Sequence, residues 1–187
     1  MLDIRRASRI FVFGLLLVPA GWAQTKPAAA ELVDATRLVE AVGEENVRLR
    51  ITIPKAILAA LSGAGGDPEI GSVVSGLESM NAVILDLSNA ERAARARKAA
   101  RDLEADLRGK GWEELAYVQE EGATVRVLVR TDGESKQIRG LVVLVIDTTD
   151  DEPALVFANV TGTIDLAKLQ QIGQGLNVPG LSDLNLK

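Results

Sequence analysis

The sequence predicts an α+β fold in which an antiparallel sheet of about six strands carries helices on one face, as a two-layer sandwich. Six segments have the alternating or continuous apolar pattern that is typical of strands. Short turn-forming links join the last four of these segments, as in antiparallel hairpins. The helical patterns are grouped between and around the strands, which disfavours a regular βαβ series. We expect the face without helices to be at least partly wet.

A helix and a strand are predicted to open the domain. The apolar positions of residues 32–42 fall on one side of a helix that Gly43 closes. Residues 47–53 then alternate apolar side chains with Arg48 and Arg50, which is the period-two pattern of a half-buried strand.

Two short helices and a second strand are predicted next. Residues 55–61 and 69–79 have helical patterns, and residues 82–87 have the pattern of a strand. Residues 63–66 are rich in glycine but lack the Lys-Ser/Thr ending of a phosphate loop, so we expect a hinge between the two helices.

The most clearly marked element is a long helix after the second strand. Ser88 and Glu91 have the spacing of a capping box, and Gly109 and Gly111 end the helix. Its apolar seam alternates spacings of three and four residues and consists of Ala93, Ala96, Ala100, Leu103 and Leu107. We expect the basic residues of its first half to form a solvated face with i to i+4 ion pairs, and a lipid or nucleic-acid surface is the alternative.

Four successive strands are predicted in the second half of the chain, over residues 112–121, 123–130, 138–147 and 154–161. Residues 141–146 are apolar at every position, which places their strand in the centre of the sheet. A last helix is expected to begin near Asp165, with Leu166, Leu169 and Ile172 on its apolar side, and an irregular tail follows from about residue 174.

The N-terminus has the pattern of a cleavable secretory signal peptide. Three arginines precede an apolar run that is shorter than the roughly 20 residues of a membrane-spanning helix. Cleavage is expected after Ala23, which makes residues 1–23 the signal peptide, 24–30 a linker and 31–187 a single α+β domain. We therefore expect a periplasmic or secreted protein with no transmembrane segment in its mature form. A retained N-terminal anchor and twin-arginine export are the alternatives.

The composition excludes several classes of site. The chain contains no cysteine and no histidine. This removes Ser-His-Asp and Cys-His catalysis and the ligands of zinc, copper and haem sites, so we expect no cofactor. The net charge of −5 becomes about −7 once the predicted signal peptide is removed. The field of an acidic protein has the wrong sign for non-specific nucleic-acid binding, and we expect none.

Four arginines form the candidate binding site. Arg48 and Arg50 share the polar side of the first strand, and Arg126 and Arg130 share the polar side of a later one. If these strands are neighbours, four guanidinium groups stand together on the open face of the sheet and can receive a carboxylate, a phosphate or an acidic partner. The alternative is cross-strand ion pairing with acidic residues of the intervening strand, namely Glu114, Glu120 or Glu121.

Carboxylates are the remaining candidates for catalysis. Asp86, Asp147 and Asp165 each lie at the end of a predicted strand, and a glycoside hydrolase needs two carboxylates within about 5 to 10 Å. Asp165 is more simply the cap of the last helix. The acidic turn from Asp147 to Glu152 lacks the twelve-residue calcium-loop pattern with its central glycine, which favours a hairpin turn over a calcium site.

Four segments carry a resemblance to a known family. They are residues 47–58, Gly111-Trp112-Glu113-Glu114-Leu115, residues 125–129, and residues 156–165 with Asn159-Val160-Thr161-Gly162-Thr163-Ile164-Asp165. These segments resemble the uncharacterised bacterial exported family filed as domain of unknown function 4252. The resemblance implies at most an envelope-sensing or regulatory association, since members are often encoded near extracytoplasmic-function sigma factors, and it supplies no catalytic residues. Many relatives resemble lipoproteins with an acylated N-terminal cysteine, which this chain lacks.

These observations together predict a noncatalytic binding or regulatory module in the envelope or outside the cell. Its expected partner is an envelope protein or an acidic ligand. One alternative is a carboxylate-dependent hydrolase that acts on cell-wall or glycan material through Asp86 and Asp147. A purely structural subunit is the other alternative.

Overall fold

The structure, a computed structural model, describes residues 32–63, 71, 74–133, 137–149 and 152–165. The predicted signal peptide, the linker, the last helix after Asp165 and the tail lie outside the described residues.

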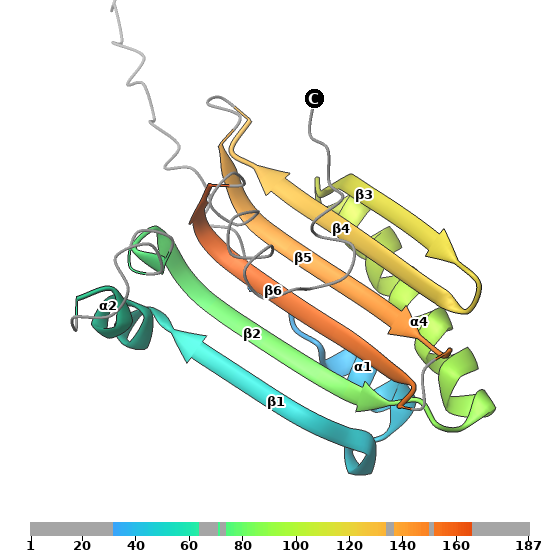
Figure 1. Cartoon of the computed structure of the whole chain (residues 1–187). Coiled ribbons are helices and arrows are strands. Elements are labelled where there is room, and N and C mark those ends of the chain that lie inside the picture. Colours follow the sequence, from blue (N-terminus) through green and yellow to red (C-terminus); the bar gives the residue numbers. More distant parts are fainter. Residues whose placement is uncertain (1–31, 64–70, 72–73, 134–136, 150–151, 166–187) are drawn as a thin grey trace, which may run out of the picture.

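Six strands form one antiparallel sheet in this part of the chain (Figure 1). The order across the sheet is β1-β2-β6-β5-β4-β3, so the last of these described strands in the sequence lies between β2 and β5. The strands are β1 Val47–Pro54, β2 Leu77–Asp86, β3 Glu113–Glu120, β4 Ala123–Thr131, β5 Ile138–Asp147 and β6 Ala154–Ile164. The predicted α+β fold with a six-stranded antiparallel sheet is confirmed.

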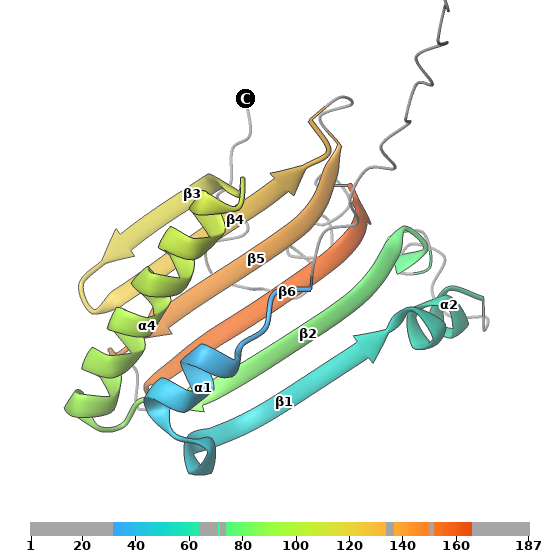
Figure 2. The same cartoon turned by 180° about the vertical axis from the view of Figure 1, so that it is seen from behind.

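Two helices cover one side of the sheet, as expected. They are α1 (Thr36–Val42) and α4 (Ala90–Gly109), and they pack side by side (Figure 2). A short 3-10 helix, η1 (Glu44–Asn46), connects α1 to β1. We call this side of the sheet the helix face and the opposite side the open face.

The main hydrophobic core lies between the two helices and the sheet. Leu38 and Val42 of α1 are buried, and so is the predicted apolar seam of α4. From the sheet, Leu85, Leu128 and Phe157 are completely buried in the same cluster. Each large side chain buried in this way stabilises the fold by about 1.5–3 kcal/mol. The three alanines of the α4 seam let that helix lie close to the strands.

The N-terminus of α4 differs from the predicted capping box. Asn89 is the cap, because its side-chain oxygen accepts a hydrogen bond from the backbone N–H of Glu91 at 2.8 Å. The Ser88 hydroxyl donates instead to the Asp86 carboxylate at 2.7 Å. A hydrogen bond to a charged carboxylate is stronger than one between neutral groups, and Asn is as good a cap as Ser. The prediction of a capping box at Ser88 is therefore wrong.

The predicted helix over residues 69–79 is wrong at its C-terminal end. β2 begins at Leu77, which pairs with Gly162 of β6. The next contact is between the hydroxyls of Ser79 and Thr161, 2.7 Å apart and separated by 82 residues of chain. Pairing with a strand this far away in the sequence makes the segment a strand. The helical periodicity within the segment contains no information about that pairing.

β6 continues three residues beyond its predicted end, because it stays paired with both neighbours as far as Gly162 and Ile164. Gly162 has a φ of 125°, in the left-handed region that favours glycine. A Cβ atom at this position would clash with the carbonyl oxygen of Gly76. Glycine is therefore required where the backbone before β2 approaches the end of β6.

The open face is apolar from one edge of the sheet to the other. Its rows of cross-strand partners contain Leu, Ile, Val, Met and Ala, and two full rows are Ile51-Ala82-Ala158-Val143-Val127-Ala116 and Leu49-Ile84-Val156-Val145-Val125-Val118. Leu49 and Ile51 at the β1 edge are about two-fifths exposed, at 40% and 39%. This face is therefore partly wet, as expected, but the prediction that it carries the polar side chains of the strands is wrong.

One short helix packs on the open face. α2 (Lys55–Gly63) follows β1 directly, and its Leu58 is buried against a second, smaller cluster. That cluster includes Ile53, Met80 and Val160, which are cross-strand partners on the open face. α2 therefore covers the end of the open face beside β1 and β2 (Figure 1).

Two asparagines hold the chain that leads into α1. Asn81 of β2 and Asn159 of β6 are cross-strand partners, and Asn159 is completely buried. The backbone N–H of Val33 donates to Asn159 Oδ1 at 2.9 Å, and Asn81 Nδ2 donates to the Val33 carbonyl at 3.1 Å. Asn159 Nδ2 also donates to the carbonyl of Leu141 at 3.0 Å. The two amides thus satisfy the Val33 backbone and tie the start of α1 to the centre of the sheet.

We expect Asn159→Ala to lower the free energy of unfolding by about 3 kcal/mol, because two buried backbone groups lose their hydrogen-bond partner. Asn81→Ala is the matched control, with an expected loss of about 1 kcal/mol. It removes one hydrogen bond and also removes Asn81 Oδ1, a buried oxygen with no partner in the described part of the chain. Urea unfolding measures both variants, and equal losses would contradict this assignment.

Candidate functional site

The four predicted arginines do not form one cluster. Arg48 and Arg50 lie on β1 at one edge of the sheet, whereas Arg126 and Arg130 lie on β4. Three strands, β2, β6 and β5, separate β1 from β4. At the usual strand spacing the two pairs are about 19 Å apart. The condition that these strands are neighbours is therefore not met.

At least three of these arginines also lie on the helix face. Arg50 is paired with Val83 and Arg126 with Leu144, and both partners belong to the core beneath the helices. Arg130 is four residues from Arg126 and shares its face. Two helices, each about 10 Å wide, leave the borders of a six-stranded sheet uncovered, so long polar side chains there can reach water.

Arg48 and Arg50 have local acidic partners. Arg48 forms an ion pair with Asp86, and its second terminal nitrogen lies 3.4 Å from a carboxylate oxygen of Glu152. Arg50 donates to Glu44 at 2.8 Å, and this hydrogen bond raises the pKa of the Arg50 guanidinium. Both arginines are therefore paired with acidic side chains at the β1 edge of the sheet.

Arg130 lines a different hollow from Arg126. This hollow has a volume of about 340 Å³ and lies beside the C-terminal end of α4, where Lys110 and Trp112 also line it. Leu128, between the two arginines on the same face, is completely buried under the helices. Arg126 and Arg130 consequently lie on separate surfaces of the protein.

Arg126 lines a groove between α4 and the β3, β4 and β5 strands. The groove has a volume of about 320 Å³. Its polar side chains come from both layers, and they are Arg97 and Arg101 of α4, Tyr117 and Gln119 of β3, and Thr124 and Arg126 of β4. Its apolar side chains are Ala100, Leu144 and Ile146. We call this feature the arginine groove.

Arg126 is held rigidly in the groove. Its guanidinium carbon lies 4.4 Å from the centre of the Tyr117 ring, which is a cation–π contact. It also forms an ion pair with Glu104 of α4 and lies 3.5 Å from Glu114 of β3. The Arg126 side chain is therefore ordered before any ligand arrives.

Glu104 is a buried carboxylate in the second half of α4. It is 8% exposed, and its Oε1 accepts hydrogen bonds from Arg108 Nε at 3.0 Å and Arg108 Nη2 at 2.9 Å. Its other oxygen pairs with Arg126. A signal was present in the sequence, because residue 104 lies four positions after Ala100 of the apolar seam and so falls on the same side of the helix.

Arg97 and Arg101 are the groove cations with least internal pairing. Arg97 donates to the hydroxyl of Thr148 at 2.9 Å. Arg101 makes no hydrogen bond or ion pair with the residues that the structure describes. The two side chains are four residues apart and share one side of α4. They therefore offer donors that an anionic group in the groove can use.

Asp86 is the centre of an ion cluster at the end of β2. It pairs with Arg48 of β1 and with Arg92 of α4, and it accepts the Ser88 hydrogen bond. The Ser88 hydrogen bond, followed by that from Arg48, lowers the pKa of Asp86. A carboxyl group with a lowered pKa stays ionised at neutral pH and is poorly suited to act as a general acid.

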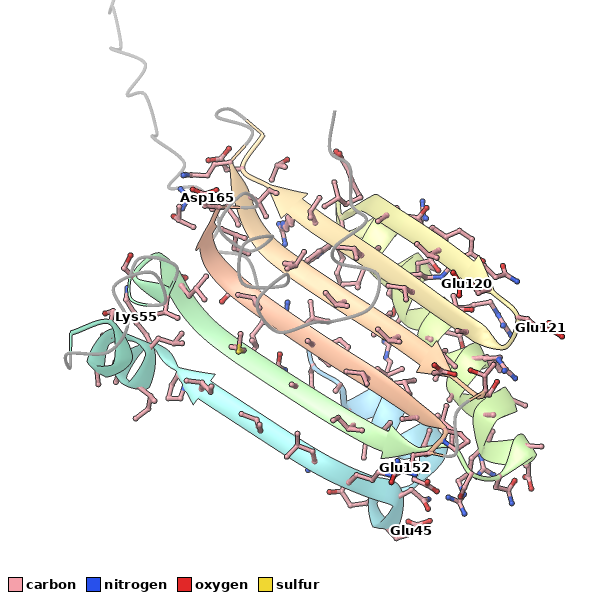
Figure 3. The ribbon with its side chains drawn as sticks, in the orientation of Figure 1. Glu45, Lys55, Glu120, Glu121, Glu152 and Asp165 are labelled. Atoms are coloured by element: carbon pink, nitrogen blue, oxygen red, sulfur yellow. The ribbon has the colours of Figure 1, made fainter. Side chains whose placement is uncertain are left out.

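The other two aspartates lie at opposite ends of the sheet. Asp86 and Asp147 are both cross-strand partners of Ala154 and so share one end of the open face. Asp147 Oδ1 accepts from the backbone N–H and the hydroxyl of Thr149, at 2.8 and 2.7 Å. Asp165 follows the far end of β6, as Figure 3 shows by comparison with Glu152. The structure therefore brings together Asp86 and Asp147 but not Asp165.

In the described ranges, no group of three or more acidic side chains is arranged to hold a metal ion. Two residues of the acidic turn, Asp150 and Asp151, lie outside those ranges. None of the helices in the described part of the chain is both long and apolar enough to span a bilayer.

We expect Glu104→Ala to lower the free energy of unfolding by about 3 kcal/mol, since Arg108 and Arg126 lose their shared buried carboxylate. The matched control is Asp102→Ala, two residues earlier on α4. Asp102 forms an exposed i to i+4 pair with Lys98, for which we expect a loss below about 0.5 kcal/mol. Thermal and urea unfolding compare the two, and similar losses would show that Glu104 is not a structural carboxylate.

The Asp86 cluster predicts a stability contribution that depends on pH. Because folding lowers the pKa of Asp86, its contribution is complete above the unfolded pKa of about 3.9 and is lost as the pH falls through the folded value. Asp86→Asn should therefore be destabilising above about pH 5, and its difference from the unmodified chain should shrink below about pH 4. Urea unfolding across this pH range measures the difference. A constant difference at all pH values would rule out the ionised cluster as its source.

This chain has 13% identity to the Saccharomyces cerevisiae Ran-binding protein Mog1p, whose crystal structure it matches over 57% of this chain and 61% of that chain with a TM-score of 0.28. The chain thus spans less than two thirds of the length of that protein. Comparison with curated proteins gives no match. The family model described as Domain of unknown function (DUF4252) matches residues 43–172, and because this is more than half of the sequence, the chain belongs to that family.

Proposed function

We propose that this protein is an exported, noncatalytic binding module whose arginine groove takes an acidic group, from an envelope protein or from a small acidic ligand. The observation that carries the proposal is the convergence of Arg97, Arg101 and Arg126 from two layers onto one groove of about 320 Å³. The sequence-based choice of Arg126 is retained, and Arg97 and Arg101 replace the three other predicted arginines.

The chemistry of the groove favours a carboxylate attached to an apolar body. Guanidinium groups bind carboxylates through paired, charge-assisted hydrogen bonds. Leu144 and Ile146 line the same groove and offer apolar contact next to these donors. Ligand pockets combine apolar contact with polar groups that fix the orientation of the ligand, and this groove offers both.

Preorganisation supports binding at Arg126. The Tyr117 ring and the Glu104 carboxylate hold its guanidinium in place, so little rotamer entropy is lost when a ligand arrives. Arg101, which is exposed on α4, supplies the donors that still lack a partner in the described chain. The Arg126 side chain is therefore already in position before a ligand binds, whereas the exposed Arg101 side chain can adjust its conformation to the ligand.

The bonding of the carboxylates supports a noncatalytic role. Asp86 is occupied by two arginines and a serine, and Asp147 is occupied by Thr149. The sequence has no histidine or cysteine to provide another nucleophile or base. Export follows from the N-terminal signal pattern, in which a basic start precedes a short apolar run.

Binding of hexanoate, with hexanol as the uncharged comparison, tests the proposal. We expect hexanoate and not hexanol to shift the amide NMR signals of α4 and β3–β4, because only the carboxylate can use the guanidinium donors. Arg101→Gln should weaken hexanoate binding about tenfold, as expected for the loss of one charge-assisted hydrogen bond.

Arg95→Gln is the matched control for this experiment. It removes the same charge from the same helix, but Arg95 pairs with Glu91 and does not line the groove. We expect its affinity for hexanoate to stay within about twofold of the unmodified chain. Equal weakening by both variants would mean that net charge, and not the groove, attracts the probe, and the proposal would fail.

A further inference from the structure

The open face of the sheet requires more cover than the described helices give. All six strands contribute apolar side chains to it. α2 contacts this face beside β1 and β2. An apolar surface of this extent is uncommon on a soluble monomer unless another segment or molecule covers it.

The burial pattern locates the missing cover over the other half of the sheet. Val127 and Val129 of β4 point to the open face as partners of Val143 and Leu141, yet they are only 3% and 6% exposed. β4 is three strands away from β2, which at the usual spacing is about 14 Å. α2 at the β1–β2 border does not account for their burial.

The chain itself continues from a suitable place. β6 ends at Ile164 in the interior of the sheet, and Ile164 belongs to the apolar cluster on the open side. Residues 166–187 follow, with apolar side chains spaced along them at Leu169, Ile172, Leu176 and Leu181. A dozen extended residues reach about 40 Å, whereas the six strands are about 24 Å across. The segment is therefore long enough to cross the whole face.

We infer that residues 166–187 bind across the open face over β5 and β4 and bury its valines with their own leucine and isoleucine side chains. The sheet then has cover on both faces within one chain. The arginine groove, on the opposite side of the sheet, is unaffected by this contact. The inference is independent of the proposed function, and each can fail without the other.

Thiol labelling in the folded full chain tests the inference, because the sequence has no cysteine and a single introduced one is the only thiol. Val127→Cys reports on the open face and Thr52→Cys on an exposed position of β1. Val142→Cys reports on the core under the helices, where Val142 is completely buried. We expect Val127→Cys to label at least about tenfold more slowly than Thr52→Cys at every protein concentration.

Substitutions in the C-terminal segment then identify the cover. Adding Leu176→Asp and Leu181→Asp should accelerate labelling of Val127→Cys about tenfold and leave Val142→Cys slow, which also shows that the helix-side core is intact. The matched control adds the same two charges at the neighbouring polar positions, as Asn177→Asp and Ser182→Asp, and should leave all rates unchanged.

Three results would overturn the inference. They are fast labelling of Val127→Cys in the otherwise unmodified chain, protection that disappears on dilution as expected for cover by a second copy, and protection that survives the two leucine substitutions.

A photoactivatable leucine analogue at position 143 gives a second measurement that does not depend on destabilised variants. It should cross-link to residues 166–187 of the same chain, and cross-links to a second copy in place of that segment would equally overturn the inference.

Discussion

The insertion of β6 between β2 and β5 is the constraint on which the rest of the structure depends. In the described pairing, β1 and β2 form one unit and β3, β4 and β5 form another, and β6 joins them. β6 also brings Asn159 opposite Asn81, which positions the chain before α1. β6, the last of the described strands in the sequence, thus completes both the sheet and the surface on which the helices pack. Its contacts are long-range, and their loop-closure entropy must be offset before they stabilise the fold.

The position of the charged side chains follows from a sheet that is apolar on both faces. The helix face is filled by the main core and the open face by rows of aliphatic side chains. Guanidinium and carboxylate groups are therefore confined to the borders, where they meet one another. Arg48 and Arg92 gather around Asp86 at one end of the sheet, and Arg126 meets Glu104 beside α4. These border clusters are the origin of both the structural ion pairs and the arginine groove.

The two surfaces proposed to make contacts differ in chemistry and lie on opposite sides of the sheet. The arginine groove is formed by two layers and depends on α4, whose register is set by its alanine and leucine seam. The open face depends on strand pairing alone. Substitutions in one surface should therefore leave the other intact, because the hydrogen-bonded sheet lies between them.

The sequence by itself determined where the long helix lies and where the strands lie, apart from the first half of β2. Period-two alternation and the α4 seam are local patterns, so residues 138–147 and the seam around Ala100 could be identified without knowing their neighbours. The family could be identified as well, since its motifs lie within strands such as the one that contains Asn159.

Only the tertiary structure decided which strands are neighbours and which side of each strand faces the helices. Alternation divides a strand into two sides but does not say which side meets a partner, so Arg50 was assigned to the wrong face. Strand order depends on contacts between residues far apart in the chain, and for that reason Arg126 is about 19 Å from Arg48 and Arg50, with which it was grouped. The pairing of Glu104 with Arg126 has the same origin, because Arg126 lies on a different element that local sequence patterns cannot place.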